Sequence, residues 1–82
     1  MTRHYVVIAL AADGTEDATI VTRNDLALAV DLARTLARDL PEATIAYRCV
    51  AGGQDVLDGA ERDALADAVA TARHQGGGSN EA

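Results

Sequence analysis

The chain has 82 residues, of which 49% are apolar and 24% are charged, and its net charge at pH 7 is −6. This length allows one domain, because domains typically hold roughly 50–200 residues. No apolar run reaches the ~18–20 residues that a membrane-spanning helix needs, so we expect no membrane partner. A negatively charged protein repels nucleic acid, so we also expect no DNA or RNA partner.

Small side chains dominate the apolar set. Alanine supplies 18 of the apolar residues, and two tyrosines are the only aromatic residues. A chain this short buries only ~60–65% of its unfolded surface, so a monomer would be marginally stable, and oligomerisation is a common remedy. The single cysteine excludes a disulfide framework. No secretory signal is recognisable, and we expect a reducing, cytoplasmic location.

The first 22 residues predict two strands joined by a turn. Residues 5–12 form a continuous apolar run, which is typical of a strand covered on both faces. The Asp13-Gly14 pair that follows is a strong turn signal. Residues 18–22 read ATIVT and predict a second strand, because β-branched residues favour strands. The alternative is an irregular loop that leads directly into the next helix.

A helix is predicted between Asn24 and Pro41. Asn24 or Thr22 can cap its start, and Asp25 sits favourably in its first turn. Pro41 ends it, because the residue before a proline disfavours helical angles. Its apolar residues recur at helical spacing and form a broad stripe. They are Leu26, Leu28, Ala29, Val30, Leu32, Ala33, Leu36, Ala37 and Leu40.

The remaining residues predict a third strand and a second helix. Residues 43–50 alternate between two faces, and residues 51–55 form a loop. Asp58 begins the second helix, with Glu61 three residues later in a capping-box arrangement. The narrow apolar stripe of this helix comprises Ala64, Leu65, Ala68, Val69 and Ala72. We assign residues 1–75 to one compact domain and residues 76–82 to a flexible Gly/Ser-rich tail.

These elements predict a two-layer α+β fold of order ββαβα, with a three-stranded antiparallel sheet of order 2-1-3. A right-handed crossover through the first helix returns the third strand beside the first. Both helices are expected to cover one face of the sheet. The residues expected on that covered face are Val6, Ile8, Leu10, Ile20, Ile45 and Cys49.

The other face of the sheet is the predicted interaction surface. It is too apolar for plain solvent and too polar for a core, which is typical of a surface that meets a partner. The outer strands also leave two sheet edges open to pairing. The residues predicted at this interface are Tyr5, Val7, Thr19, Val21, Ala46, Arg48 and Val50.

No motif predicts catalysis, a cofactor, a metal ion or a small-molecule ligand. Cys49 is expected on the helix-facing side of its strand, where a thiol is inert. Asp13, Glu16 and Asp17 cluster within five residues, and the simplest reading is a solvated turn. The glycines at 52 and 53 precede a helix, but the Walker pattern and any lysine are missing. We therefore expect a protein that is not an enzyme.

The sequence thus predicts a small, acidic, non-catalytic interaction or regulatory module. We expect it to self-associate as a homodimer, through its open sheet face or an edge strand, or to bind another protein. A first alternative is a phage- or antitoxin-type inhibitor that presents its acidic helices to a basic target. The order of the first 40 residues, a hairpin followed by a helix, resembles that of small antitoxin domains. A second alternative is an enzyme whose site is shared between subunits.

Overall fold

A computed structural model describes residues 2–77 of the chain. Two long strands come first, followed by a helix, a third long strand, a very short strand and a second helix. Their bounds are β1 Arg3–Leu10, β2 Glu16–Thr22, α1 Leu26–Asp39, β3 Thr44–Ala51, β4 Gln54–Asp55 and α2 Gly59–Gly77. The residue that caps α1 is Asp25, whose carboxylate accepts a hydrogen bond from the Leu28 amide at 3.2 Å, and not the expected Asn24 or Thr22.

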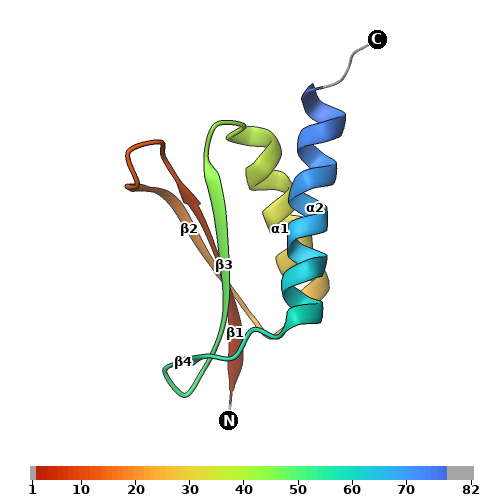
Figure 1. Cartoon of the computed structure of the whole chain (residues 1–82). Coiled ribbons are helices and arrows are strands. Elements are labelled where there is room, and N and C mark those ends of the chain that lie inside the picture. The colour runs from red at the N-terminus through yellow and green to blue at the C-terminus, as the bar shows by residue number, and fades with distance from the viewer. Residues whose placement is uncertain (1, 78–82) are drawn as a thin grey trace.

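The strands form one antiparallel sheet of order β2-β1-β3-β4, and both helices lie on the same side of it (Figure 1). The predicted two-layer α+β fold is confirmed, but the predicted count of three strands is wrong by one. The additional strand β4 forms because Gly52 and Gly53 adopt positive φ angles of 59° and 79°, which turn the chain back beside β3. Its two residues carry no apolar pattern that sequence analysis could detect.

The predicted orientation of β1 is wrong. Tyr5, Val7 and Ala9 face the helices and are 2%, 0% and 0% exposed. Val6, Ile8 and Leu10 are therefore on the opposite, uncovered face and are half-buried. The prediction failed because β1 is apolar at both alternate sets of positions, so hydrophobic periodicity does not choose between them. The orientations of the other two long strands are confirmed, since Ile20, Ile45 and Cys49 all belong to the core cluster or pack against it.

The core lies between the sheet and the two helices. Leu65 is its largest fully buried side chain, and Leu36 of α1 is 7% exposed. Alanines on both helices complete it, and small side chains allow helices to approach closely. These alanines are Ala29, Ala33, Ala37, Ala68 and Ala72.

Arg73 fastens the far end of α2 to the turn that follows α1. Its guanidinium donates to the backbone carbonyl of Leu40 at 3.3 Å and to that of Ala43. The helix continues through Gly76 and Gly77, which the sequence placed in the tail. Residues 78–82, the rest of that predicted tail, lie outside the described residues. Within residues 2–77, neither helix combines the length and the apolar character that a membrane crossing requires.

Candidate functional site

The sheet surface opposite the helices is the first candidate site, and we name it the open face. Cross-strand pairing fixes its rows: Ile8 lies between Thr19 and Ala46, and Val6 lies between Val21 and Arg48. Its residues come from the three long strands. They are His4, Val6, Ile8 and Leu10 of β1, Glu16, Thr19 and Val21 of β2, and Thr44, Ala46, Arg48 and Val50 of β3.

The structure brings five of the seven predicted interface residues together on the open face. Thr19, Val21, Ala46, Arg48 and Val50 all belong to it. The other two, at positions 5 and 7, are core residues under the helices and are withdrawn from the predicted surface. Sequence reasoning missed their neighbours at positions 6, 8 and 10, because nothing in the run YVVIAL distinguishes its two faces.

The corrected open face is more apolar than the predicted one. It gains a valine, an isoleucine and a leucine from the central strand and loses a tyrosine and a valine. Val21 is 63% exposed, the most of any large apolar residue described. Exposed apolar patches on soluble proteins mark surfaces that bind a partner.

A bulge interrupts the outer edge of the sheet. Ala9 pairs with Ala18, but Leu10 pairs with Glu16, so β2 carries one additional residue there. Glu16 accepts a hydrogen bond from the Thr19 hydroxyl at 2.8 Å, which holds its side chain on the open face. Bulges and charges at an edge discourage pairing with another strand. The other edge, β4, has only two residues. Neither edge is a better candidate than the open face.

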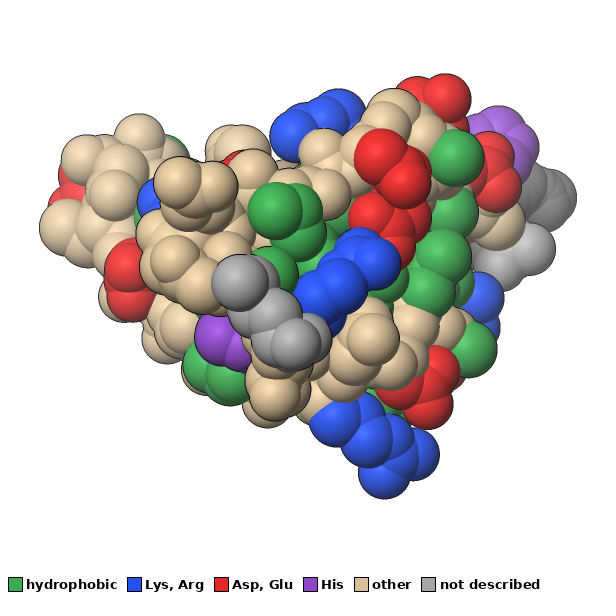
Figure 2. Space-filling model, turned by 90° about the horizontal axis from the view of Figure 1, so that it is seen from below, with side chains coloured by type: hydrophobic (Ala, Val, Ile, Leu, Met, Phe, Trp, Pro, Cys, Tyr) green, Lys and Arg blue, Asp and Glu red, His purple; other side chains and the backbone are tan. Residues whose placement is uncertain are grey.

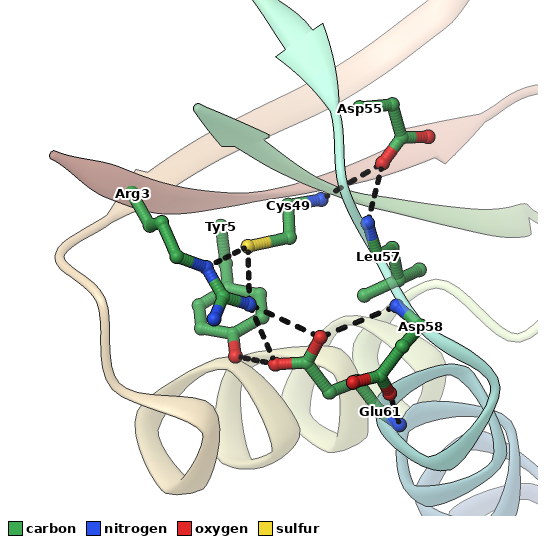
Figure 3. A network of polar contacts seen from close by, with 7 residues as sticks. All are labelled: Arg3, Tyr5, Cys49, Asp55, Leu57, Asp58 and Glu61. Atoms are coloured by element: carbon green, nitrogen blue, oxygen red, sulfur yellow. Dashed lines mark hydrogen bonds and ion pairs between the residues drawn. The ribbon is translucent and has the colours of Figure 1, made fainter. Parts of the chain in front are cut away.

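A polar cluster at the N-terminal end of α2 is the second candidate site (Figure 3). We name it the Arg3–Glu61 cluster; it comprises Arg3, Tyr5, Cys49 and Glu61. The Arg3 guanidinium donates to both Glu61 carboxylate oxygens, at 2.9 and 3.1 Å, and to the Cys49 sulfur, at 3.0 and 3.2 Å. The Tyr5 hydroxyl donates to Glu61 as well. The cluster thus joins β1, β3 and α2.

Local sequence places Glu61 in this position. The Asp58 carboxylate accepts from the Glu61 amide at 2.8 Å, and Glu61 Oε1 accepts from the Asp58 amide at 3.3 Å. This is the predicted capping box, which satisfies amides at the helix start. Asp55 holds the segment before α2 against β3, because its Oδ1 accepts from the amides of Cys49 and Leu57 at 3.3 and 3.1 Å. The Glu61 carboxylate thus contacts the helix start through Oε1 and β1 through both of its oxygens.

The electrostatics of the cluster favour its charged form. The hydrogen bond from Tyr5 lowers the pKa of Glu61, and Arg3 adds to this effect, while burial opposes it. Burial and the bond to Glu61 raise the pKa of Tyr5 to about 12. The contact with the Cys49 sulfur, with a smaller contribution from Glu61, raises the pKa of Arg3. The cluster therefore holds a carboxylate, a neutral phenol and a guanidinium at neutral pH.

The contacts of the cluster hold α2 against the sheet. Cys49 is 0% exposed, so no substrate reaches its thiol without opening the fold. The carboxylate is already saturated by Arg3, Tyr5 and the helix start. Seen from the end of the molecule where the N-terminus lies, basic and acidic side chains are in contact and hydrophobic side chains flank them (Figure 2). The Arg3–Glu61 cluster is a latch between α2 and the sheet.

The opposite end of the molecule holds a shallow pocket of about 400 Å³. It lies between the β1–β2 turn and the turn after α1, and Asp17, Asp39 and Glu42 are among its lining residues. Asp13 does not contribute, because its carboxylate accepts from the amide and hydroxyl of Thr15 at 3.0 and 2.7 Å, which lowers its pKa. Across the part of the chain that the structure describes, no three His, Cys, Asp or Glu side chains are grouped to hold a metal ion.

Comparison with known proteins adds no function to this geometry. No family model, curated protein or solved structure matches the chain.

Proposed function

We propose that the protein is a non-catalytic interaction module that forms a homodimer through its open face. One observation carries this proposal: both helices lie on one side of the sheet, which leaves Val6, Ile8, Leu10 and Val21 without a covering layer among residues 2–77 (Figure 1). Packing two such faces together removes apolar area from water at about 25 cal/mol per Å². Two sheets packed in this way form a sandwich with helices on both outer sides.

The charge distribution favours a second copy as the partner. The chain carries a net charge of −6, so two copies repel each other at long range. The open face contains one arginine, Arg48, and one glutamate, Glu16, so its formal charges cancel. Contact through two open faces therefore keeps the excess negative charge of each copy away from the interface.

The size of the open face predicts how tightly it binds. Three strands of about eight residues span roughly 27 by 14 Å, from the usual rise and strand spacing. Specific interfaces bury ~800 Å² on each partner, so this face, with a projected area of roughly 380 Å², is smaller than a standard interface. We expect a reversible dimer with a dissociation constant in the micromolar range, and not a permanent one.

Sedimentation equilibrium of the wild type and two matched variants tests the proposal. Ala46→Asp places a charge on the open face beside Ile8 of the central strand, and Ala27→Asp places the same charge on the exposed side of α1. We expect a reversible dimer for the wild type and for Ala27→Asp, and a monomer for Ala46→Asp. Ile8→Thr, which keeps the β-branched shape, is a second open-face variant and should also weaken the dimer.

Circular dichroism confirms that each variant remains folded. A wild-type monomer at several hundred micromolar, or equal dimerisation of a folded Ala46→Asp protein, would contradict the proposal. A monomer that binds a basic protein would instead favour the inhibitor alternative.

A further inference from the structure

We infer that the outer edge of β3 binds an extended peptide segment of a partner protein as an additional strand of the sheet. This inference goes beyond the proposed dimer, because it concerns an edge of the sheet and not its open face. On the side of β3 away from β1, β4 pairs with Val50 and Ala51 only and lies beside one end of the strand (Figure 1). The stretch from Thr44 to Arg48 has no neighbouring strand on that side among residues 2–77.

The hydrogen bonds of Cys49 show which backbone groups point toward this edge. The Cys49 carbonyl accepts from the Val56 amide at 2.6 Å, and the Cys49 amide donates to Asp55 Oδ1 at 3.3 Å (Figure 3). Both Cys49 groups therefore point away from β1. Along a strand, the amide and carbonyl of one residue point to the same side, and those of the next residue point to the opposite side. Ile45 and Tyr47 therefore each turn an amide and a carbonyl toward the open edge.

These four backbone groups form a binding edge with defined ends. At one end, the groups of Cys49 are already bonded. At the other end, the Ala43 amide donates to the Leu40 carbonyl at 3.1 Å, and the Ala43 carbonyl accepts from the Arg73 guanidinium. The free stretch between them is Thr44–Arg48, which is roughly 17 Å of strand. Peptides that extend a sheet bind through such unpaired backbone groups.

The side chains beside the edge specify the chemistry of the peptide. On the helix-facing side, Ile45 is 8% exposed and Tyr47 is half-buried, so the peptide residues opposite them should be apolar. On the open-face side, Arg48 is exposed and makes no ion pair within the described part of the chain. Opposite charges directly across two strands stabilise their pairing. The peptide therefore carries apolar residues at alternate positions and an acidic residue opposite Arg48.

A second copy of the chain fits this edge less well than a peptide does. An antiparallel pairing that joins all the free groups places Ile45 opposite Tyr47 of the second copy, and Cys49 opposite Ala43 of the second copy. Val56 already occupies the position opposite Cys49, so the second copy would collide with it. Moving the register by two residues in either direction places a free residue opposite Ala43 or Cys49, whose groups are already bonded. A short peptide ends before these obstacles.

Amide hydrogen exchange, followed by NMR on the intact protein, tests whether the edge is free and whether a peptide binds it. The amides of Ala46 and Arg48 point toward β1 and should exchange slowly, whereas those of Ile45 and Tyr47 should exchange quickly. An acetylated and amidated peptide, Glu-Val-Thr-Val-Thr, should slow exchange at Ile45 and Tyr47 and shift their resonances. Slow exchange of these two amides in the dilute protein without peptide would overturn the inference.

Two N-methylated peptides provide a matched comparison. In the antiparallel pairing, the amides of both valines face β3, and the amide of the central threonine faces away. N-methylation of both valines removes two donors and should raise the dissociation constant at least about tenfold. N-methylation of the central threonine should change it by less than about threefold. Equal binding of all three peptides, or no binding of the parent peptide at millimolar concentration, would also overturn the inference.

A charge exchange tests the acidic residue of the peptide. Arg48→Glu should weaken binding of the parent peptide about fivefold at low ionic strength, and a peptide with Lys in place of Glu should recover it. Arg34→Glu changes an exposed arginine of α1 in the same way and should bind the parent peptide like the wild type. Unchanged binding to the Arg48→Glu protein would overturn the chemistry assigned to the peptide.

The edge and the proposed dimer can fail separately. Ile8→Thr, which should weaken the open-face dimer, leaves the backbone of β3 unchanged and should bind the peptide as the wild type does. A wild-type monomer that binds the peptide would overturn the dimer and support the edge. Protection of the Ile45 and Tyr47 amides that appears without peptide, and only at high protein concentration, would show that a second copy pairs at this edge and would overturn the choice of a peptide.

Discussion

The side chain of Glu61 contacts two elements of the fold at once, the start of α2 and the strand β1. Its carboxylate serves the start of α2, accepts both contacts from Arg3 and accepts the Tyr5 hydroxyl. The Glu61 side chain is 13% exposed, so these bonds are shielded from water more than a surface ion pair is. Hydrogen bonds to charged groups contribute more than neutral ones. The latch between α2 and β1 therefore depends on this charge.

Replacing Glu61 with Gln should lower the free energy of unfolding by about 1–2 kcal/mol at pH 7, because the shape is kept while the charge is lost. Glu42→Gln, which removes the same charge from an exposed position, should change it by less than about 0.5 kcal/mol. Urea titrations measure both values. Equal effects of the two substitutions would show that the latch does not stabilise the fold.

The lowered pKa of Glu61 predicts that the stability of the fold depends on pH in the acidic range. The folded-state pKa of Glu61 lies below its ordinary value of 4.5, so the carboxylate's contribution is complete above that pH. The contribution is lost as the pH falls through the lowered folded-state pKa. The stability difference between wild type and Glu61→Gln should therefore shrink below pH 4.5.

At the scale of single elements, the helices could be predicted better than the sheet. Caps and 3.6-residue periodicity are local, so the apolar stripes of both helices and the Asp58–Glu61 capping box are confirmed. The orientation of β1 could not be predicted, because both of its faces are apolar and the choice depends on packing. The Arg3–Glu61 contact, which joins residues 58 apart, left no signal in the sequence.

The buried face of α1 gives the sharpest test at this scale. Leu36→Ala should lower the free energy of unfolding by ~2–5 kcal/mol, because the alanines around it cannot fill the cavity. Arg34→Ala is the control on the exposed side, where a 3.4 Å contact with Asp31 contributes little, and should change stability by less than about 0.5 kcal/mol. Urea titrations that gave the reverse order would mean that α1 packs through its arginine side.

At the scale of the whole molecule, the fold has two layers, a sheet and a pair of helices, and its small side chains bury little apolar area between them. A core of alanines, few leucines and no Phe or Trp removes little apolar area from water. The third layer that would cover the sheet is missing within the described residues. The short chain and its small side chains predict that copies of the protein associate. The structure adds Val6, Ile8 and Leu10 to the surface predicted for that association.

Methyl NMR spectra recorded over a dilution series test the open face most directly. We predict that the methyl resonances of Val6, Ile8, Leu10, Val21 and Val50 shift together as the protein is diluted through the micromolar range. The methyl resonances of Leu28 and Leu32 on α1 should stay in place. Shifts confined to the helices, or no shifts at any concentration, would contradict the account.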